Sequence, residues 1–124
     1  MVIRLVEGDA ATRAPLVSRL SSVLGVSGSL ATSRLTRLEC RTKPLREGDL
    51  VTLAQFDVFF AGSELVIVEL QSSVIESATE LRARYNLKTP DAIHLAAALE
   101  VGASFFLTGD RNLSRCSELP VEVL

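Results

Sequence analysis

The sequence predicts an α/β fold with a mainly parallel central sheet and helices on both of its faces. Segments with apolar residues at helical spacing alternate along the chain with short β-branched runs, which is typical of βαβ units. Four apolar residues follow one another at Leu65–Val68, and such a run predicts a strand covered on both faces, as in a parallel sheet. With 124 residues the chain is expected to form one domain, residues 1–124, with a substantial core.

The first half of the chain is predicted to form a helix, a strand and two further helices. Residues 29–32 follow two glycines and are a strand candidate. Ser33 is a suitable N-cap for a helix that we expect to end near Pro44. The first and third helices each carry apolar residues at helical spacing; these are Leu16, Val17, Leu20, Val23 and Leu24, and then Leu50, Leu53, Phe56 and Phe60.

The second half repeats the alternation of strand and helix. Residues 64–69 are predicted to form a strand, followed by a helix at Ser72–Tyr85. Thr89 is predicted to be the N-cap of the next helix, with Pro90 at its first position. Two more strands are expected at residues 104–108 and 121–124. The helix at Ser72–Tyr85 is expected to direct four residues inward: Val74, Ile75, Ala78 and Leu81.

Two acids stand where this fold would concentrate chemistry. Asp91 lies in the first turn of a predicted helix, where the helix dipole favours its negative charge. Asp110 follows Gly109 at the end of a predicted strand. In open α/β sheets ligands bind at the carboxyl ends of the strands, so we expect the two acids to contribute to a cation site.

Composition limits the class of protein. Net charge is −2, which argues against a protein that coats nucleic acid through bulk positive charge, although it does not exclude a nuclease. Cys40 and Cys116 are isolated and are expected to be small buried residues without a disulfide. No apolar run approaches the length of a membrane span and no signal peptide precedes the domain, so a cytoplasmic location is expected.

Three motifs carry a family resemblance. The segment TPDAIHLAAAL followed by FFLTGD resembles the PIN-domain ribonucleases, and in particular the VapC-type toxins of bacterial toxin–antitoxin pairs. SRLTRLECRTKPLREGD, residues 33–49, matches the family's segment around its second acid, here Glu39. The resemblance covers residues 2–124 and implies a PIN-like three-layer sandwich. It further implies a metal-dependent endoribonuclease that uses Mg²⁺ or Mn²⁺, acts on RNA, forms a homodimer and is inhibited by a cognate antitoxin.

The resemblance assigns catalysis and metal binding to Glu39, Asp91 and Asp110. Clustered carboxylates repel one another unless a cation lies between them, and hard oxygen ligands select Mg²⁺ or Mn²⁺. Thr108 and Asn112 flank Asp110 and are expected to support the site through hydrogen bonds.

Each of these residues also has an ordinary structural interpretation. Asp91 alone fits a helix-start acid, and Asp110 alone fits a turn residue, with Thr108 and Asn112 as parts of the turn. Glu39 alone fits a solvated helix residue or an ion-pair partner of Arg37 or Lys43. His94 lies three residues after Asp91, and a structural hydrogen bond is favoured for it over metal binding.

Basic residues are densest on the predicted helix that carries Glu39. They could contact RNA phosphates, or they could form a solvated helix face, and the two interpretations are about equally supported. No aromatic platform for base stacking is present, so the sequence does not indicate which RNA sequence is recognised, and RNA-binding residues stay unassigned. The basic group consists of Arg34, Arg37, Arg41, Lys43 and Arg46.

The N-terminus departs from the family pattern. PIN domains open with a strand ending in Asp-Thr-Asn or Asp-Thr-Ser, whose Asp is the first metal-site acid, and this sequence begins just after that motif. The favoured interpretation makes residues 2–7 the remnant of the family's first helix. In the alternative, residues 1–6 replace the strand and bring Glu7 or Asp9 near the missing acid.

A missing central strand has a cost and a consequence. Unpaired backbone groups inside a sheet cost about 1–3 kcal/mol each, so we expect a misplaced start or a shortened chain. An intact mass of the native protein equal to that of the 124-residue chain would refute this expectation. Without the first acid, metal affinity and activity should fall. The alternative function is a catalytically inactive PIN-fold module that binds antitoxin or RNA, and a weaker one is a DNA-directed nuclease on the same fold.

Overall fold

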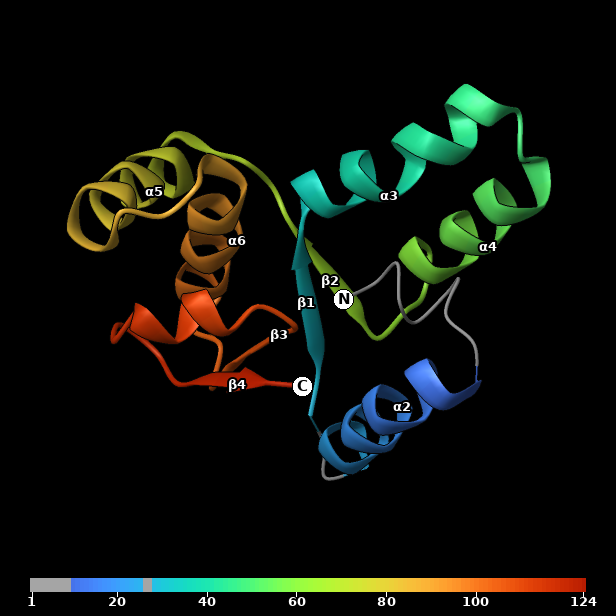
Figure 1. Cartoon of the computed structure of the whole chain (residues 1–124), viewed down its shortest axis with the longest axis horizontal. Coiled ribbons are helices and arrows are strands. Elements are labelled where there is room, and N and C mark those ends of the chain that lie inside the picture. Colours follow the sequence, from blue (N-terminus) through green and yellow to red (C-terminus); the bar gives the residue numbers. More distant parts are fainter. Residues whose placement is uncertain (1–9, 26–27) are drawn as a thin grey trace. The chain divides into compact units, whose positions relative to one another are not determined.

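The computed structural model describes residues 10–25 and 28–124, in which helices and short strands alternate (Figure 1). This alternation confirms the predicted α/β class. No helix in these ranges is long and apolar enough to cross a membrane. In chain order the elements are α2 (Ala10–Leu24), β1 (Leu30–Ser33), α3 (Arg34–Glu47), α4 (Leu50–Phe60), β2 (Leu65–Val68), α5 (Ser72–Tyr85), α6 (Thr89–Glu100), β3 (Phe106–Thr108), the 3₁₀-helix η1 (Arg111–Arg115) and β4 (Val121–Val123).

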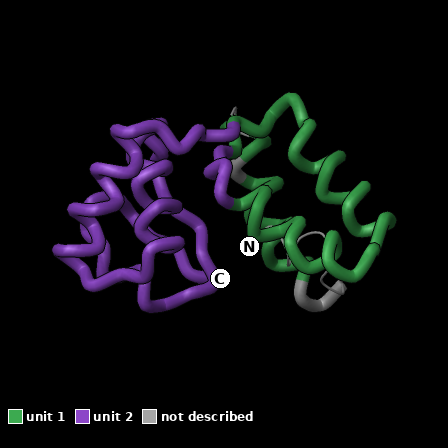
Figure 2. Tube along the Cα trace, turned by 90° about the horizontal axis from the view of Figure 1, so that it is seen from above, with its two compact units in different colours: residues 1–30, 36–66 green, residues 31–35, 67–124 purple. Residues whose placement is uncertain are grey.

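The chain divides into two compact units, which Figure 2 shows in different colours. Unit 1 comprises residues 1–30 and 36–66, and therefore holds α2, most of α3 and all of α4. Unit 2 comprises residues 31–35 and 67–124, and therefore holds α5, α6 and every later element. The predictions made for residues 1–9 lie outside the described residues.

The described strands pair as two ladders, β1 with β2 and β3 with β4. β3 and β4 are parallel, with Phe106 opposite Val121. At the start of the other ladder the Leu30 N–H donates to the carbonyl of Glu64, and just past its end Arg34 pairs with Glu69, so β1 and β2 also run in one direction. We predicted that β2 is covered on both faces. Val66 is 49% exposed, so this prediction is wrong at Val66.

In α2 only part of the predicted apolar face is buried. Leu16 is fully buried, and Leu20 and Leu24 are half-buried. Val17 is 42% exposed, so its assignment to the inward face is wrong. Val17 directly follows Leu16, and consecutive helical residues are about 100° apart around the axis, so Val17 lies at the edge of the face that Leu16 and Leu20 share.

Helix α3 continues through Pro44, so the prediction that it ends there is wrong. Proline lacks an N–H and disrupts the backbone hydrogen bond to the preceding turn, but here the ring is buried and packing compensates. The helix ends instead at Gly48, whose φ of 66° is the left-handed conformation that glycine adopts without steric penalty. The N–H of Asp49 then donates to the Pro44 carbonyl at 2.9 Å and closes the last turn.

Helix α4 begins at a strong N-cap. Asp49 accepts from the Thr52 N–H at 3.1 Å and from the Thr52 hydroxyl at 2.7 Å, and these hydrogen bonds lower the pKa of the Asp49 carboxyl. Leu53, Phe56 and Phe60 are buried, as predicted. Leu50 is 76% exposed, so its placement on the buried face is wrong. Leu50 is the first residue of α4, and the buried residues of this helix begin one turn later, at Leu53.

Helices α5 and α6 pack against each other and form the core of unit 2. Helix α5 was predicted with the right extent, and its residues Val74, Ala78 and Leu81 face inward as expected. Ile75 is 40% exposed, so its inward placement is wrong. The remaining core side chains are mostly small or aliphatic and comprise Val68, Leu87, Ala92, Leu95, Ala96, Ala97, Leu113, Cys116 and Leu119.

Helix α6 begins one residue earlier than predicted. Lys88 is the N-cap, with an extended backbone and no side-chain hydrogen bond to the helix, so the assignment of Thr89 as N-cap is wrong. Pro90 is accommodated because the first N–H groups of a helix have no acceptor within it. Asp91 lies in the first turn as predicted. Cys40 and Cys116 are buried, also as predicted.

Candidate functional site

The carboxyl ends of β1 and β2 gather polar side chains in unit 2. Ser33 ends β1 and is 3% exposed, and its hydroxyl lies 2.8 Å from Nδ1 of His94 on α6. This hydrogen bond connects the end of the strand with the N-terminal half of the helix. The hydrogen bond predicted for His94 is therefore confirmed.

The hydrogen bond between Ser33 and His94 also positions the helix that carries Asp91. It lies three residues before His94, and residues at that spacing share one face of a helix. Its side chain is half-buried, and its position in the first turn lets the helix dipole stabilise its charge. The face of α6 that meets the end of β1 through His94 therefore also carries Asp91.

An ion pair joins the two strand ends. Nε of Arg34 donates to both oxygens of the Glu69 carboxylate at 3.1 Å, and Nη2 of Arg34 donates to Oε1. These hydrogen bonds raise the pKa of Arg34 and lower the pKa of Glu69. Sequence reasoning missed the pair. A usable signal was present, because Arg34 and Glu69 each lie at the end of a predicted strand and the carboxyl ends of neighbouring parallel strands lie side by side.

Asp110 is held by a short turn at the end of β3. It is the N-cap of η1, and its Oδ1 accepts from the Asn112 N–H at 2.9 Å. Its own N–H donates to the hydroxyl of Thr108 at 3.1 Å, and Thr108 is buried. Asn112 therefore acts through its backbone. Thr108 fixes the backbone of Asp110. The Asp110 carboxylate is exposed, and its Oδ2 accepts no hydrogen bond from the described residues.

Glu39 lies on α3 in unit 1, and its side chain is exposed. Arg37, one of the ion-pair partners considered for it, instead binds Asp57 at 3.1 Å. Asp91 and Asp110 belong to unit 2. Within residues 10–25 and 28–124 no three His, Cys, Asp or Glu side chains are grouped to hold a metal ion. The convergence of the three acids therefore stays a prediction.

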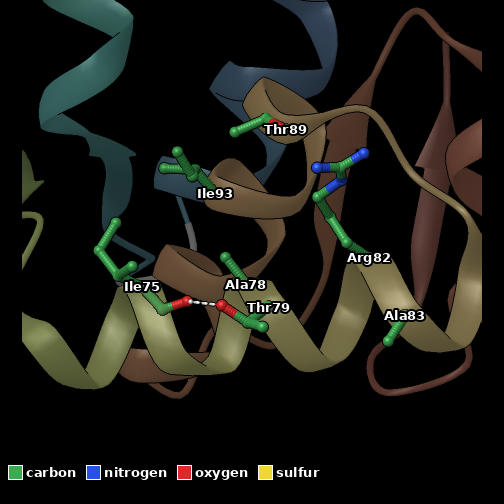
Figure 3. A pocket seen from close by; sticks show the side chains of 7 residues that line it. All are labelled: Ile75, Ala78, Thr79, Arg82, Ala83, Thr89 and Ile93. Atoms are coloured by element: carbon green, nitrogen blue, oxygen red, sulfur yellow. Dashed lines mark hydrogen bonds between the residues drawn. The ribbon is translucent and has the colours of Figure 1, made fainter.

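A second feature of unit 2 is an open groove of about 490 Å³ between α5 and α6 (Figure 3). Arg82 supplies the only charge among its lining residues, and its Nε donates to the carbonyl of Leu87 at 2.9 Å. With no acid in its lining, the groove is not a cation site. It is lined by Ile75, Ala78, Thr79, Arg82, Ala83, Thr89 and Ile93.

Comparison with known proteins decides the family. The family model described as PIN domain matches residues 1–119. This chain belongs to the PIN domain family. A chain in the crystal structure of VapBC2 from Rickettsia felis, bound to a DNA fragment from their promoter, matches with a TM-score of 0.75 and 16% sequence identity. The match covers 98% of the present chain and 91% of that chain, so the two share the PIN fold. No curated protein matched the sequence.

The acids of this PIN domain are suited to a divalent ion by their chemistry. Asp91 and Asp110 offer hard carboxylate oxygens, and Asp110 has one oxygen that no described residue engages. Mg²⁺ and Mn²⁺ prefer such ligands and keep part of their water shell. The nearby imidazole of His94 hydrogen-bonds Ser33 through Nδ1, and because Mg²⁺ and Mn²⁺ prefer oxygen ligands to imidazole nitrogen, the carboxylates are the candidate ligands.

Proposed function

We propose that this PIN domain is a metal-dependent endoribonuclease and the toxin of a toxin–antitoxin pair. Membership of the PIN domain family carries the proposal, and the placement of Asp91 and Asp110 at the start of a helix and the end of a strand supports it. We also propose that the two units form one domain, because a single family model spans residues 1–119.

Glu39, Asp91 and Asp110 would hold Mg²⁺ or Mn²⁺. Such an ion activates water and stabilises negative charge on a phosphodiester that is being cleaved. The chain's own contribution is positioning. The Asn112 N–H orients the carboxylate of Asp110, the Thr108 hydroxyl fixes its backbone, and the Ser33–His94 hydrogen bond anchors the helix that carries Asp91.

The proposal extends to partners and location. One solved structure that shares this fold is of VapBC2 from Rickettsia felis bound to a DNA fragment from their promoter. By analogy we propose that this chain binds a cognate antitoxin, forms a homodimer and acts on RNA in the cytoplasm. Size measurement of the chain alone, and again with the product of an adjacent gene, tests the two assemblies.

Cleavage of single-stranded RNA during a Mg²⁺ or Mn²⁺ titration tests the activity. We expect cleavage to require the ion and Asp91→Asn to abolish it, because the amide removes a charge from the ligand set. Glu80→Gln, at an exposed acid of α5, is the matched control and should cleave normally. Unchanged cleavage by Asp91→Asn would refute the site. RNA binding without cleavage by the wild-type chain would favour the inactive binding module.

A further inference from the structure

We propose that Arg34 is a phosphate-binding residue for single-stranded RNA and that Glu69 is its positioning residue. The inference rests on the proposed function, since it takes RNA as the ligand. It assigns a binding role to one pair of side chains at the carboxyl ends of β1 and β2.

The geometry of the pair leaves part of the guanidinium available. Glu69 engages Nε and Nη2 of Arg34, which are two of the three nitrogens. Nη1 makes no hydrogen bond with any described residue, and the Arg34 side chain is 44% exposed. A guanidinium presents N–H donors along two edges, so an Arg held by a carboxylate on one edge can bind a phosphate on the other.

Stability gives a weaker explanation for the pair. Both side chains are about half exposed, at 44% and 53%, and ion pairs with that exposure contribute little to folding. A side chain as long as arginine is nevertheless fixed in one orientation by several hydrogen bonds. Holding a flexible donor in place before a ligand arrives reduces the conformational entropy lost on binding.

The location connects the pair with the proposed catalytic residues. Arg34 directly follows Ser33, and the Ser33 hydroxyl contacts His94 on the helix face that also carries Asp91. All of these residues belong to unit 2. A phosphate bound by Arg34 would therefore lie at the strand end that contacts His94, and Asp91 lies on the same face of α6 as His94.

The test measures RNA binding without metal, so that it does not depend on cleavage. A fluorescent single-stranded polyuridine oligonucleotide is titrated with the full chain in EDTA, at several salt concentrations. We expect Arg34→Ala to weaken binding about tenfold, since one charge-assisted contact is lost. The slope of log affinity against log salt should become shallower by about 0.7. Arg46→Ala, at an exposed arginine in the last turn of the same helix, is the control and should bind normally.

Glu69→Ala separates positioning from charge. The variant removes a negative charge, and charge alone would strengthen RNA binding. If Glu69 positions Arg34, binding should instead weaken about two- to threefold at elevated salt, where the charge effect is screened. Glu64→Ala, at the other end of β2, removes the same charge as a control and should not weaken binding.

Three results would overturn the proposal. These are equal affinities for Arg34→Ala and Arg46→Ala, stronger binding by Glu69→Ala, and no binding of the oligonucleotide by the wild-type chain. Unfolding of Arg34→Ala is checked by circular dichroism, and the Glu69→Ala result decides in that case. If the proposed nuclease function fails while this one holds, RNA will bind through Arg34 but will not be cleaved when Mn²⁺ is added.

Discussion

The hydrogen bond between Ser33 and His94 should be measurable as an energetic coupling. Ser33→Ala removes a hydroxyl that is 3% exposed and lies 2.8 Å from Nδ1 of His94. A buried hydrogen bond whose loss leaves its partner unsatisfied costs about 1–3 kcal/mol. We expect about 1.5 kcal/mol here, because His94 is only half-buried and water can replace part of the contact. For a chain of 124 residues this corresponds to a fall in Tm of roughly 4–8 °C.

A double-mutant cycle assigns that cost to the pair. The free energy of unfolding is measured in urea for Ser33→Ala, for His94→Leu and for the double variant. If the hydrogen bond exists, the double variant should lose about 1 kcal/mol less than the sum of the single losses. Thr79→Ala removes an exposed hydroxyl on α5 and serves as the control, and its loss should add to that of His94→Leu. Simple additivity of Ser33→Ala with His94→Leu would refute the contact and the placement of Asp91 that depends on it.

Three further predictions concern local structure. Asp49→Ala should lower the urea midpoint at neutral pH, because Thr52 loses its acceptor. The pKa of Asp49 in the folded chain is lowered from its usual value of 3.8. The stabilisation by Asp49 is therefore present above that pH and is lost as pH falls through the folded pKa. If wild type remained more stable than Asp49→Ala in strong acid, that result would contradict the N-cap. Gly48→Ala should lower the free energy of unfolding by about 1 kcal/mol and Gly48→Asn by less, because there is space for a side chain and only the positive φ disfavours one. Equal losses for the two variants in thermal unfolding would argue against the positive φ. Phe56 is fully buried, so Phe56→Ala should cost about 3–5 kcal/mol in urea unfolding. Val58 is 75% exposed, so Val58→Ala should cost less than about 0.5 kcal/mol. Similar losses for the two variants would refute the orientation of α4.

Secondary structure was the most predictable part of this chain. The helices α4 and α5 have the extents that the apolar spacing predicts, because helical periodicity over three or more turns is a strong signal. The errors lie where one local rule competes with packing. Pro44 would end an isolated helix, yet α3 continues because the proline ring is buried.

Burial on the helix faces was less predictable than helix extent. Leu50, Val17 and Ile75 are apolar and lie at helical spacing, but they are 76%, 42% and 40% exposed. Spacing identifies which residues share a face. It does not identify what packs against that face, which depends on contacts between residues far apart in the sequence.

The candidate site shows the same division. The local positions of Asp91 and Asp110 followed from the sequence, because helix starts and strand ends have local signals. The Arg34–Glu69 and Ser33–His94 contacts join residues 35 and 61 positions apart. The predicted strand ends indicate that Arg34 and Glu69 lie near each other, but no local pattern specifies the Ser33–His94 contact. The grouping of Glu39 with the two aspartates depends on the same kind of long-range contact.

The charge distribution favours RNA recognition by positioned groups over long-range attraction. The chain has a net charge of −2, and Arg34, Arg37, Arg41 and Arg84 each lie beside a carboxylate. Paired arginines add little to the field far from the protein, so electrostatic steering of RNA should be weak. Affinity must then come from short-range donors and from divalent ions that neutralise the acids. Inert Ca²⁺ should accordingly strengthen RNA binding more than an equal ionic strength of KCl. Binding that depends on ionic strength alone would argue against the acidic residues as a divalent-ion site that contributes to RNA affinity, and would leave Arg34 to be tested by its own variant.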